Sequence, residues 1–95
     1  MKSLENKRFF ELQIRGVVQG VWYRKSCREK ALELELAGIV KNMPDGSVYC
    51  KVEGEIDPLM AFIEWCKQGP PMAKVEKVTV INGPLKNYKS FEILR

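Results

Sequence analysis

Two short segments of the sequence combine residue types that could hold a phosphate group. The first runs from Gly16 to Tyr23, contains two glycines and is followed directly by Arg24. A glycine-bearing loop that enters a helix can aim several main-chain N–H groups at one anion, and an arginine beside it adds a planar fork of donors that matches phosphate oxygens. The second segment, residues 38–46, carries Asn42, whose side-chain amide both donates and accepts hydrogen bonds. Together the two segments predict a small phosphate-handling site.

The patterns around these segments predict the elements that must position them. Phe10, Leu12 and Ile14 alternate with polar residues, which is typical of a half-buried strand that leads into the glycine loop. The expected strands cover residues 9–15, 39–43, 47–53, 74–82 and 90–94, with a bulge near Glu76, and the first expected helix covers residues 22–34. This order predicts an α+β protein with the ferredoxin-like βαββαβ sandwich. Two helices would cover one face of an antiparallel sheet, and a short extra strand would follow at the C-terminal end.

The second helix has the clearest local signals. Asp57 fits the N-cap position and Pro58 the first helical position. The apolar stripe that follows has the spacing of one helical face, and its members are Leu59, Phe62, Ile63 and Cys66. Gly69 and the two prolines after it end the helix.

The composition limits what the chain can be. With 95 residues it forms one domain, expected over residues 8–95 behind a flexible tail of residues 1–7. It lacks a long apolar run and an N-terminal apolar segment, so we expect a cytoplasmic protein without a membrane partner. The three cysteines fall at inward positions and lack metal-site spacing, so we expect buried thiols and no metal. The chain has no histidine, which excludes histidine-based proton transfer.

The two segments that predict a phosphate site resemble the signature motifs of the acylphosphatases. The motifs are Gly-x-Val-Gln-Gly-Val-x-Tyr-Arg at residues 16–24 and Gly-x-Val-Lys-Asn-x-x-Asp-Gly-x-Val at residues 38–48. Further matches in order and spacing are Glu53-Gly54, Gly69-Pro70-Pro71 and Phe91-Glu92-Ile93. The resemblance covers the chain from about residue 8 to residue 95. This chain differs at Ile39, where the family often has tryptophan, at Glu35, where it often has glycine, and at Trp22, where phenylalanine is common.

The resemblance implies a reaction and a set of site residues. Acylphosphatases hydrolyse acyl phosphates to a carboxylate and inorganic phosphate without a metal or organic cofactor. Carried over to this sequence, Arg24 would hold the phosphoryl group and Asn42 would position the attacking water. The phosphate cradle would be the main chain of Gly16, Val17, Val18, Gln19, Gly20, Val21, Trp22 and Tyr23. The small-molecule partners would be an acyl phosphate as substrate and inorganic phosphate as product and competitive inhibitor.

This chemistry suits a chain without histidine. The leaving group of an acyl phosphate is a carboxylate, whose conjugate acid has a pKa of roughly 4 to 5, so no general acid is needed to protonate it. The protein must instead hold the phosphoryl oxygens and place a water in line with the leaving oxygen.

Several other interpretations remain open at this stage. The chain is mildly basic, with a net charge of +4, and RNA-recognition domains share the expected topology, although the chain lacks their aromatic strand signature. A phosphate- or metabolite-binding module without catalysis would keep the same cradle. Gly16 and Gly20 could serve only the backbone of a turn, and Trp22 and Tyr23 fit packing at the helix start better than ligand contact. We expect a monomer that binds no nucleic acid.

Overall fold

The computed structural model describes residues 6–94 and has the element order that the sequence predicts. Its elements are β1 (Lys7–Val17), α1 (Tyr23–Glu33), β2 (Ala37–Asn42), β3 (Val48–Glu55), α2 (Ile56–Gln68), β4 (Lys74–Gly83) and β5 (Phe91–Ile93). Neither α1 nor α2, the helices of the described residues, has the length and apolar character needed to cross a bilayer.

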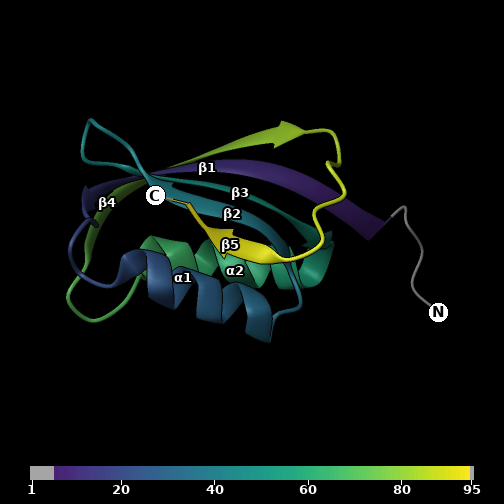
Figure 1. Cartoon of the computed structure of the whole chain (residues 1–95), viewed down its shortest axis with the longest axis horizontal. Coiled ribbons are helices and arrows are strands. Elements are labelled where there is room, and N and C mark those ends of the chain that lie inside the picture. The colour runs from purple at the N-terminus through teal and green to yellow at the C-terminus, as the bar shows by residue number, and fades with distance from the viewer. Residues whose placement is uncertain (1–5, 95) are drawn as a thin grey trace.

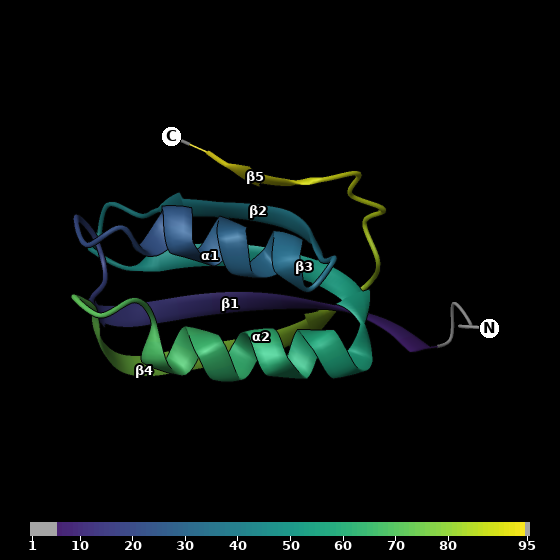
Figure 2. The same cartoon turned by 90° about the horizontal axis from the view of Figure 1, so that it is seen from below.

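The strands form one sheet whose order is β4-β1-β3-β2-β5. The first four strands pair antiparallel in the ferredoxin-like order, whereas the short β5 pairs parallel to β2, so the complete sheet is mixed. Both helices cover the same face, with α1 over the β2 side and α2 over the β4 side (Figures 1 and 2). This arrangement confirms the expected α+β sandwich with its extra C-terminal strand.

The core lies between the sheet and the two helices. Leu12 and Ile14 of β1 point into it, and α2 contributes its expected stripe of Leu59, Phe62, Ile63 and Cys66. The three cysteines are free and fully buried in this core, as the sequence predicts. Burial raises the pKa of each thiol, so the cysteines stay neutral and pack as small apolar side chains.

The structure confirms the predicted bulge in β4 but not the predicted N-cap of α2. The expected bulge is confirmed, because the register between β1 and β4 passes from Lys77 to Val75 and leaves Glu76 without a partner on β1. The predicted N-cap of α2 is wrong. The helix begins at Ile56 with Glu55 as its cap residue, so Asp57 lies inside the first turn. There its negative charge still favours the helix N-terminus.

The N-terminal tail was expected to cover residues 1–7. Residues 1–5 lie outside the described residues, and β1 already includes Lys7, which is opposite Glu55 of β3.

Residues 84–90 connect β4 to β5 and fix the position of the last strand. Figure 1 shows this connector descending from the end of β4 to the start of β5 at the opposite edge of the sheet. Glu53 of β3 is 7% exposed, and its carboxylate accepts hydrogen bonds from the main-chain N–H groups of Lys86 and Tyr88, each at 2.7 Å. The connector also brings the Lys86 ammonium to 5.7 Å from the ring centroid of Phe9, which is 2% exposed. One carboxylate therefore anchors the segment that delivers β5.

Replacing this carboxylate should destabilise the protein. We expect Glu53→Ala to lower the free energy of unfolding by about 2–3 kcal/mol, because two charge-assisted hydrogen bonds are lost and two N–H groups lose their acceptor. Urea denaturation measures the loss. The matched control is Glu29→Ala on the exposed side of α1, which should cost less than about 0.5 kcal/mol. Equal losses in the two variants would contradict the anchoring role.

Candidate active site

The loop between β1 and α1 and the end of β2 border one surface cavity of about 370 Å³. It is lined by Val18, Gly20, Trp22, Tyr23, Arg24, Lys25, Asn42 and Ile93. The structure thus brings together side chains from the two segments that the sequence singled out. Lys25 and Ile93 were not predicted, because only the fold shows that β5 and the first turn of α1 reach this cavity.

The two glycines of the loop have different roles. Gly16 and Val17, predicted as part of the phosphate cradle, still belong to β1 and pair with β4. Gly16 has φ +130°, and a Cβ there would collide with the Lys74 carbonyl oxygen, so this glycine serves the close approach of β4. Gly20 has φ +74° and open space around it, so its requirement is the left-handed turn that bends the chain around the cavity.

Main-chain N–H donors are available along the loop between β1 and α1, which is shorter than the predicted cradle because Gly16 and Val17 belong to β1. Among residues 6–94, the N–H groups of residues 18–22 donate no hydrogen bond to another main-chain group. The loop runs directly into α1, whose first-turn N–H groups have no acceptor within the helix, and no side chain caps them. A helix N-terminus of this kind favours an anion through its free donors and its dipole.

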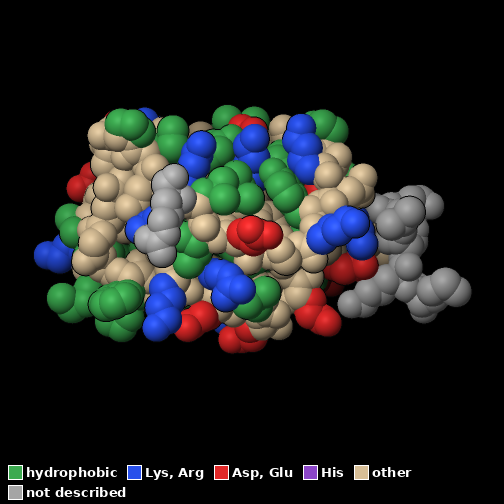
Figure 3. Space-filling view, viewed as in Figure 1, with side chains coloured by type: hydrophobic (Ala, Val, Ile, Leu, Met, Phe, Trp, Pro, Cys, Tyr) green, Lys and Arg blue, Asp and Glu red, His purple; other side chains and the backbone are tan. Residues whose placement is uncertain are grey.

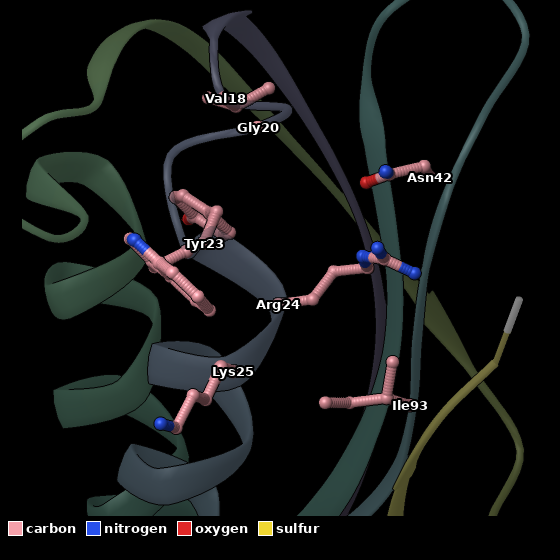
Figure 4. A pocket seen from close by; sticks show the side chains of 8 residues that line it. Val18, Gly20, Tyr23, Arg24, Lys25, Asn42 and Ile93 are labelled. Atoms are coloured by element: carbon pink, nitrogen blue, oxygen red, sulfur yellow. The ribbon is translucent and has the colours of Figure 1, made fainter.

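Arg24 extends across the cavity from α1. Figure 4 shows its guanidinium group reaching toward β2, on the side where Asn42 lies. Its Nη1 donates a hydrogen bond of 3.3 Å to the carbonyl oxygen of Leu94, just beyond β5. This single long contact steers the side chain into the cavity and leaves most of its donors for a ligand.

Asn42 carries the most unusual polar atom of the site. Its Oδ1 is buried and has no hydrogen-bond partner among the described residues. Buried polar atoms are almost always paired, because an unpaired one costs about 1–3 kcal/mol. An unpaired acceptor that borders a cavity is therefore suited to a ligand or a water molecule.

Gln19 does not line the cavity but joins its two halves. Its Nε2 donates to the carbonyl oxygens of Met43 and Ser47, both at 2.8 Å. These carbonyls belong to the turn between β2 and β3, directly after Asn42. The Gln19 side chain therefore fixes the loop against the strand end that carries Asn42, which sequence reasoning had missed.

The same turn is stiffened from its other side. The Asp45 carboxylate accepts hydrogen bonds from the side-chain hydroxyl and the main-chain N–H of Ser47, at 2.6 and 2.9 Å, and lies 3.3 Å from Arg15 of β1. These contacts, with those from Ser47 the strongest, lower the pKa of Asp45. The turn thus keeps one shape beside Asn42.

Trp22 and Tyr23, both expected to pack at the helix start, behave differently. Tyr23 is 1% exposed, its hydroxyl donates to the Cys66 carbonyl oxygen at 2.8 Å, and burial raises its pKa. It anchors the start of α1 to α2. Trp22 instead is 72% exposed on the rim of the cavity, so for this residue the packing interpretation is wrong.

The charged side chains that line the cavity are basic. Figure 3 shows Lys and Arg side chains along the upper edge of this face and over α1, with acidic side chains between them. Arg24 and Lys25 both line the cavity, and none of the acidic residues between positions 6 and 94 does. The electrostatic potential at the cavity therefore favours an anionic ligand.

Comparison with known proteins decides the family. The model of the acylphosphatase family matches residues 10–93. The chain belongs to the acylphosphatase family. It is 52% identical over 82 residues to an acylphosphatase of Acaryochloris marina, covering 86% of this chain and 88% of the relative. It is 50% identical over 82 residues to an acylphosphatase of Aeropyrum pernix, covering 84% and 81%.

The architecture is also that of solved acylphosphatases. The structure of an acylphosphatase from Coxiella burnetii superposes with a TM-score of 0.93 at 36% identity, covering 99% of both chains. The fold inferred from the sequence motifs is therefore the fold of the family, and the cavity described above lies on an acylphosphatase scaffold.

The Gln19 bridge predicts a specific loss of stability. Gln19→Glu keeps the shape of the side chain but replaces the donating NH₂ with an oxygen that faces two carbonyl oxygens. We expect the free energy of unfolding to fall by about 2 kcal/mol, measured by urea denaturation. Gln13→Glu, at a glutamine of strand β1 that precedes the loop, is the matched control, and its effect should stay within about 0.5 kcal/mol. An equal effect of both changes would show that the bridge does not hold the loop.

Proposed function

We propose that this acylphosphatase-family chain hydrolyses the carboxyl–phosphate bond of acyl phosphates to a carboxylate and inorganic phosphate. The observation that carries the proposal is the shared cavity of Arg24 and Asn42, which combines a buried, unpaired amide oxygen, a guanidinium group held by one long hydrogen bond, and a loop of unpaired N–H groups. The named relatives, which are about half identical over most of the chain, support the same activity.

The phosphoryl group would be held by main-chain and guanidinium donors. The cradle consists of the N–H groups of residues 18–23 together with Arg24, because Gly16 and Val17 are engaged in strand pairing. Charge on the phosphoryl oxygens grows or redistributes in the transition state, and fixed donors stabilise it without reorganisation. A site of this kind binds inorganic phosphate, the product, as a competitive inhibitor.

Asn42 would place the attacking water. Its Oδ1 accepts a hydrogen bond from the water and orients the oxygen lone pair toward phosphorus. The water oxygen forms a new bond to phosphorus, the bond from phosphorus to the carboxyl oxygen breaks with its electron pair on the carboxylate, and both water protons stay with the phosphate product, one of them on a phosphoryl oxygen. Because that carboxylate is a weak base, no acid is required on the leaving side.

We further propose that the chain acts as a cytoplasmic monomer on small molecules, without a nucleic-acid or membrane partner. Its net charge of +4 comes from sixteen basic and twelve acidic residues that are interspersed along the sequence. Nucleic-acid binding depends on a dense positive patch that neutralises several phosphates at once.

Removing the guanidinium group of Arg24 should weaken phosphate binding and lower the rate of hydrolysis. We expect Arg24→Ala to lower kcat/KM for benzoyl phosphate by about 10²–10³-fold and to raise the inhibition constant of inorganic phosphate. Hydrolysis followed by ultraviolet absorbance gives both values. Lys30→Ala, which removes a half-buried cation from the same helix outside the cavity lining, is the control and should leave them unchanged. Activity of Arg24→Ala near that of the wild type would contradict the proposal.

Removing the side-chain amide of Asn42 should lower kcat and leave phosphate binding nearly unchanged. Asn42→Ala is expected to lower kcat by about 10²-fold, because the water loses its orientation, while the inhibition constant of phosphate changes by less than about threefold. The same assay separates the two effects, and Asn82→Ala on exposed β4 serves as control. Should phosphate inhibition weaken as much as kcat falls, Asn42 would bind the phosphoryl group rather than the water.

A further inference from the structure

Trp22 has a backbone conformation that its side chain disfavours. Its φ and ψ are 65° and 19°, in the left-handed region, immediately before α1 begins at Tyr23. For a bulky residue this conformation is strained, because Cβ approaches the following carbonyl oxygen, whereas glycine or asparagine adopts it readily. The strain at this position calls for an explanation outside local backbone preference.

Packing does not supply that explanation. The side chain of Trp22 is 72% exposed, whereas its neighbour Tyr23 is 1% exposed. Its recorded ring contact among the described residues is the Lys25 ammonium, 5.6 Å from the ring centroid. The fold thus holds a large apolar ring in water, in a strained conformation, on the rim of the cavity that contains Arg24 and Asn42.

The geometry of the reaction shows what this ring would meet. In an in-line displacement the attacking water and the leaving oxygen lie on opposite sides of phosphorus. Asn42, which would hold the water, belongs to the β2 wall of the cavity, and α1 forms the facing wall (Figure 4). The acyl group therefore leaves on the side of α1, where Trp22 and Lys25 line the cavity.

We propose that Trp22 forms the acyl-group subsite and selects acyl phosphates whose acyl group is a planar aromatic ring. This inference rests on the proposed function. Stacked or tilted aromatic pairs have a more favourable interaction free energy than the burial of their apolar area alone provides. An acetyl group presents only one methyl to the indole, so its contact with Trp22 adds little to the binding free energy. The Lys25 ammonium lies 5.6 Å from the centroid of the Trp22 ring, and in Figure 4 the Lys25 side chain turns away from Arg24.

The test is the ratio of kcat/KM for benzoyl phosphate to kcat/KM for acetyl phosphate. We expect Trp22→Asn to lower this ratio about fivefold, mainly through KM for benzoyl phosphate, because the stacking surface is lost. Asparagine tolerates the left-handed conformation, so the loop keeps its shape and the melting temperature should not fall. Any loss that affects both substrates cancels in the ratio. Trp22→Phe keeps an aromatic ring and should hold the ratio within about twofold of the wild type.

The matched control is Met72→Asn, which replaces another exposed apolar side chain, 70% exposed and outside the cavity lining. It should leave the ratio unchanged. A ratio in Trp22→Asn equal to that of the wild type would overturn the subsite while the proposed hydrolysis stands. If the wild type hydrolyses neither substrate, the proposed function itself fails and the subsite fails with it, so the two failures are distinguishable.

Discussion

The site depends on the two hydrogen bonds that the Gln19 side chain donates to the carbonyl oxygens of Met43 and Ser47. They join a loop that follows β1 to a turn that follows β2, and these segments are otherwise separated by α1 in the sequence. The sheet already holds β1 and β2 in register through β3, and the bridge adds a direct link between the loop of N–H groups and the strand end that carries Asn42. The proposed catalysis works by positioning, which requires accuracy of a fraction of an ångström, so this link bears directly on the proposed chemistry.

The remaining contacts leave the site open to a phosphoryl group. Arg24 is held by one long hydrogen bond to Leu94, and Asn42 Oδ1 is buried without a partner. Unused polar groups lower the stability of the free protein, and a ligand that satisfies them recovers that free energy on binding. In the proposed reaction, the anionic substrate would supply acceptors for the remaining donors of Arg24 and for the loop. The leaving carboxylate needs no proton, so the chain can act without histidine.

The sequence predicted the fold well, because alternation, helical stripes and glycine turns are local signals, and Arg24 and Asn42, which it singled out, line one cavity. Prediction from the sequence failed where the role of a residue depends on a contact that is distant along the chain. The partners of Gln19 lie 24 and 28 residues away, so no pattern near Gln19 indicates the bridge. Trp22 and Tyr23 are adjacent and both aromatic, and only the left-handed backbone at Trp22 turns one ring outward while the other enters the core. The start of α2 was misplaced because Asp57 is a favourable residue both at the cap and in the first turn.

The central claim is that the loop amides, Arg24 and Asn42 act on one phosphate. A titration with inorganic phosphate, followed by amide and side-chain chemical shifts in NMR spectra, tests it most directly. The account predicts saturable shifts that are largest for the main-chain amides of residues 18–23, the Arg24 guanidinium and the Asn42 side-chain NH₂, all with one dissociation constant. Shifts centred on lysines of the open sheet face, such as Lys41 and Lys51 beside Tyr49, with none in the loop, would contradict it.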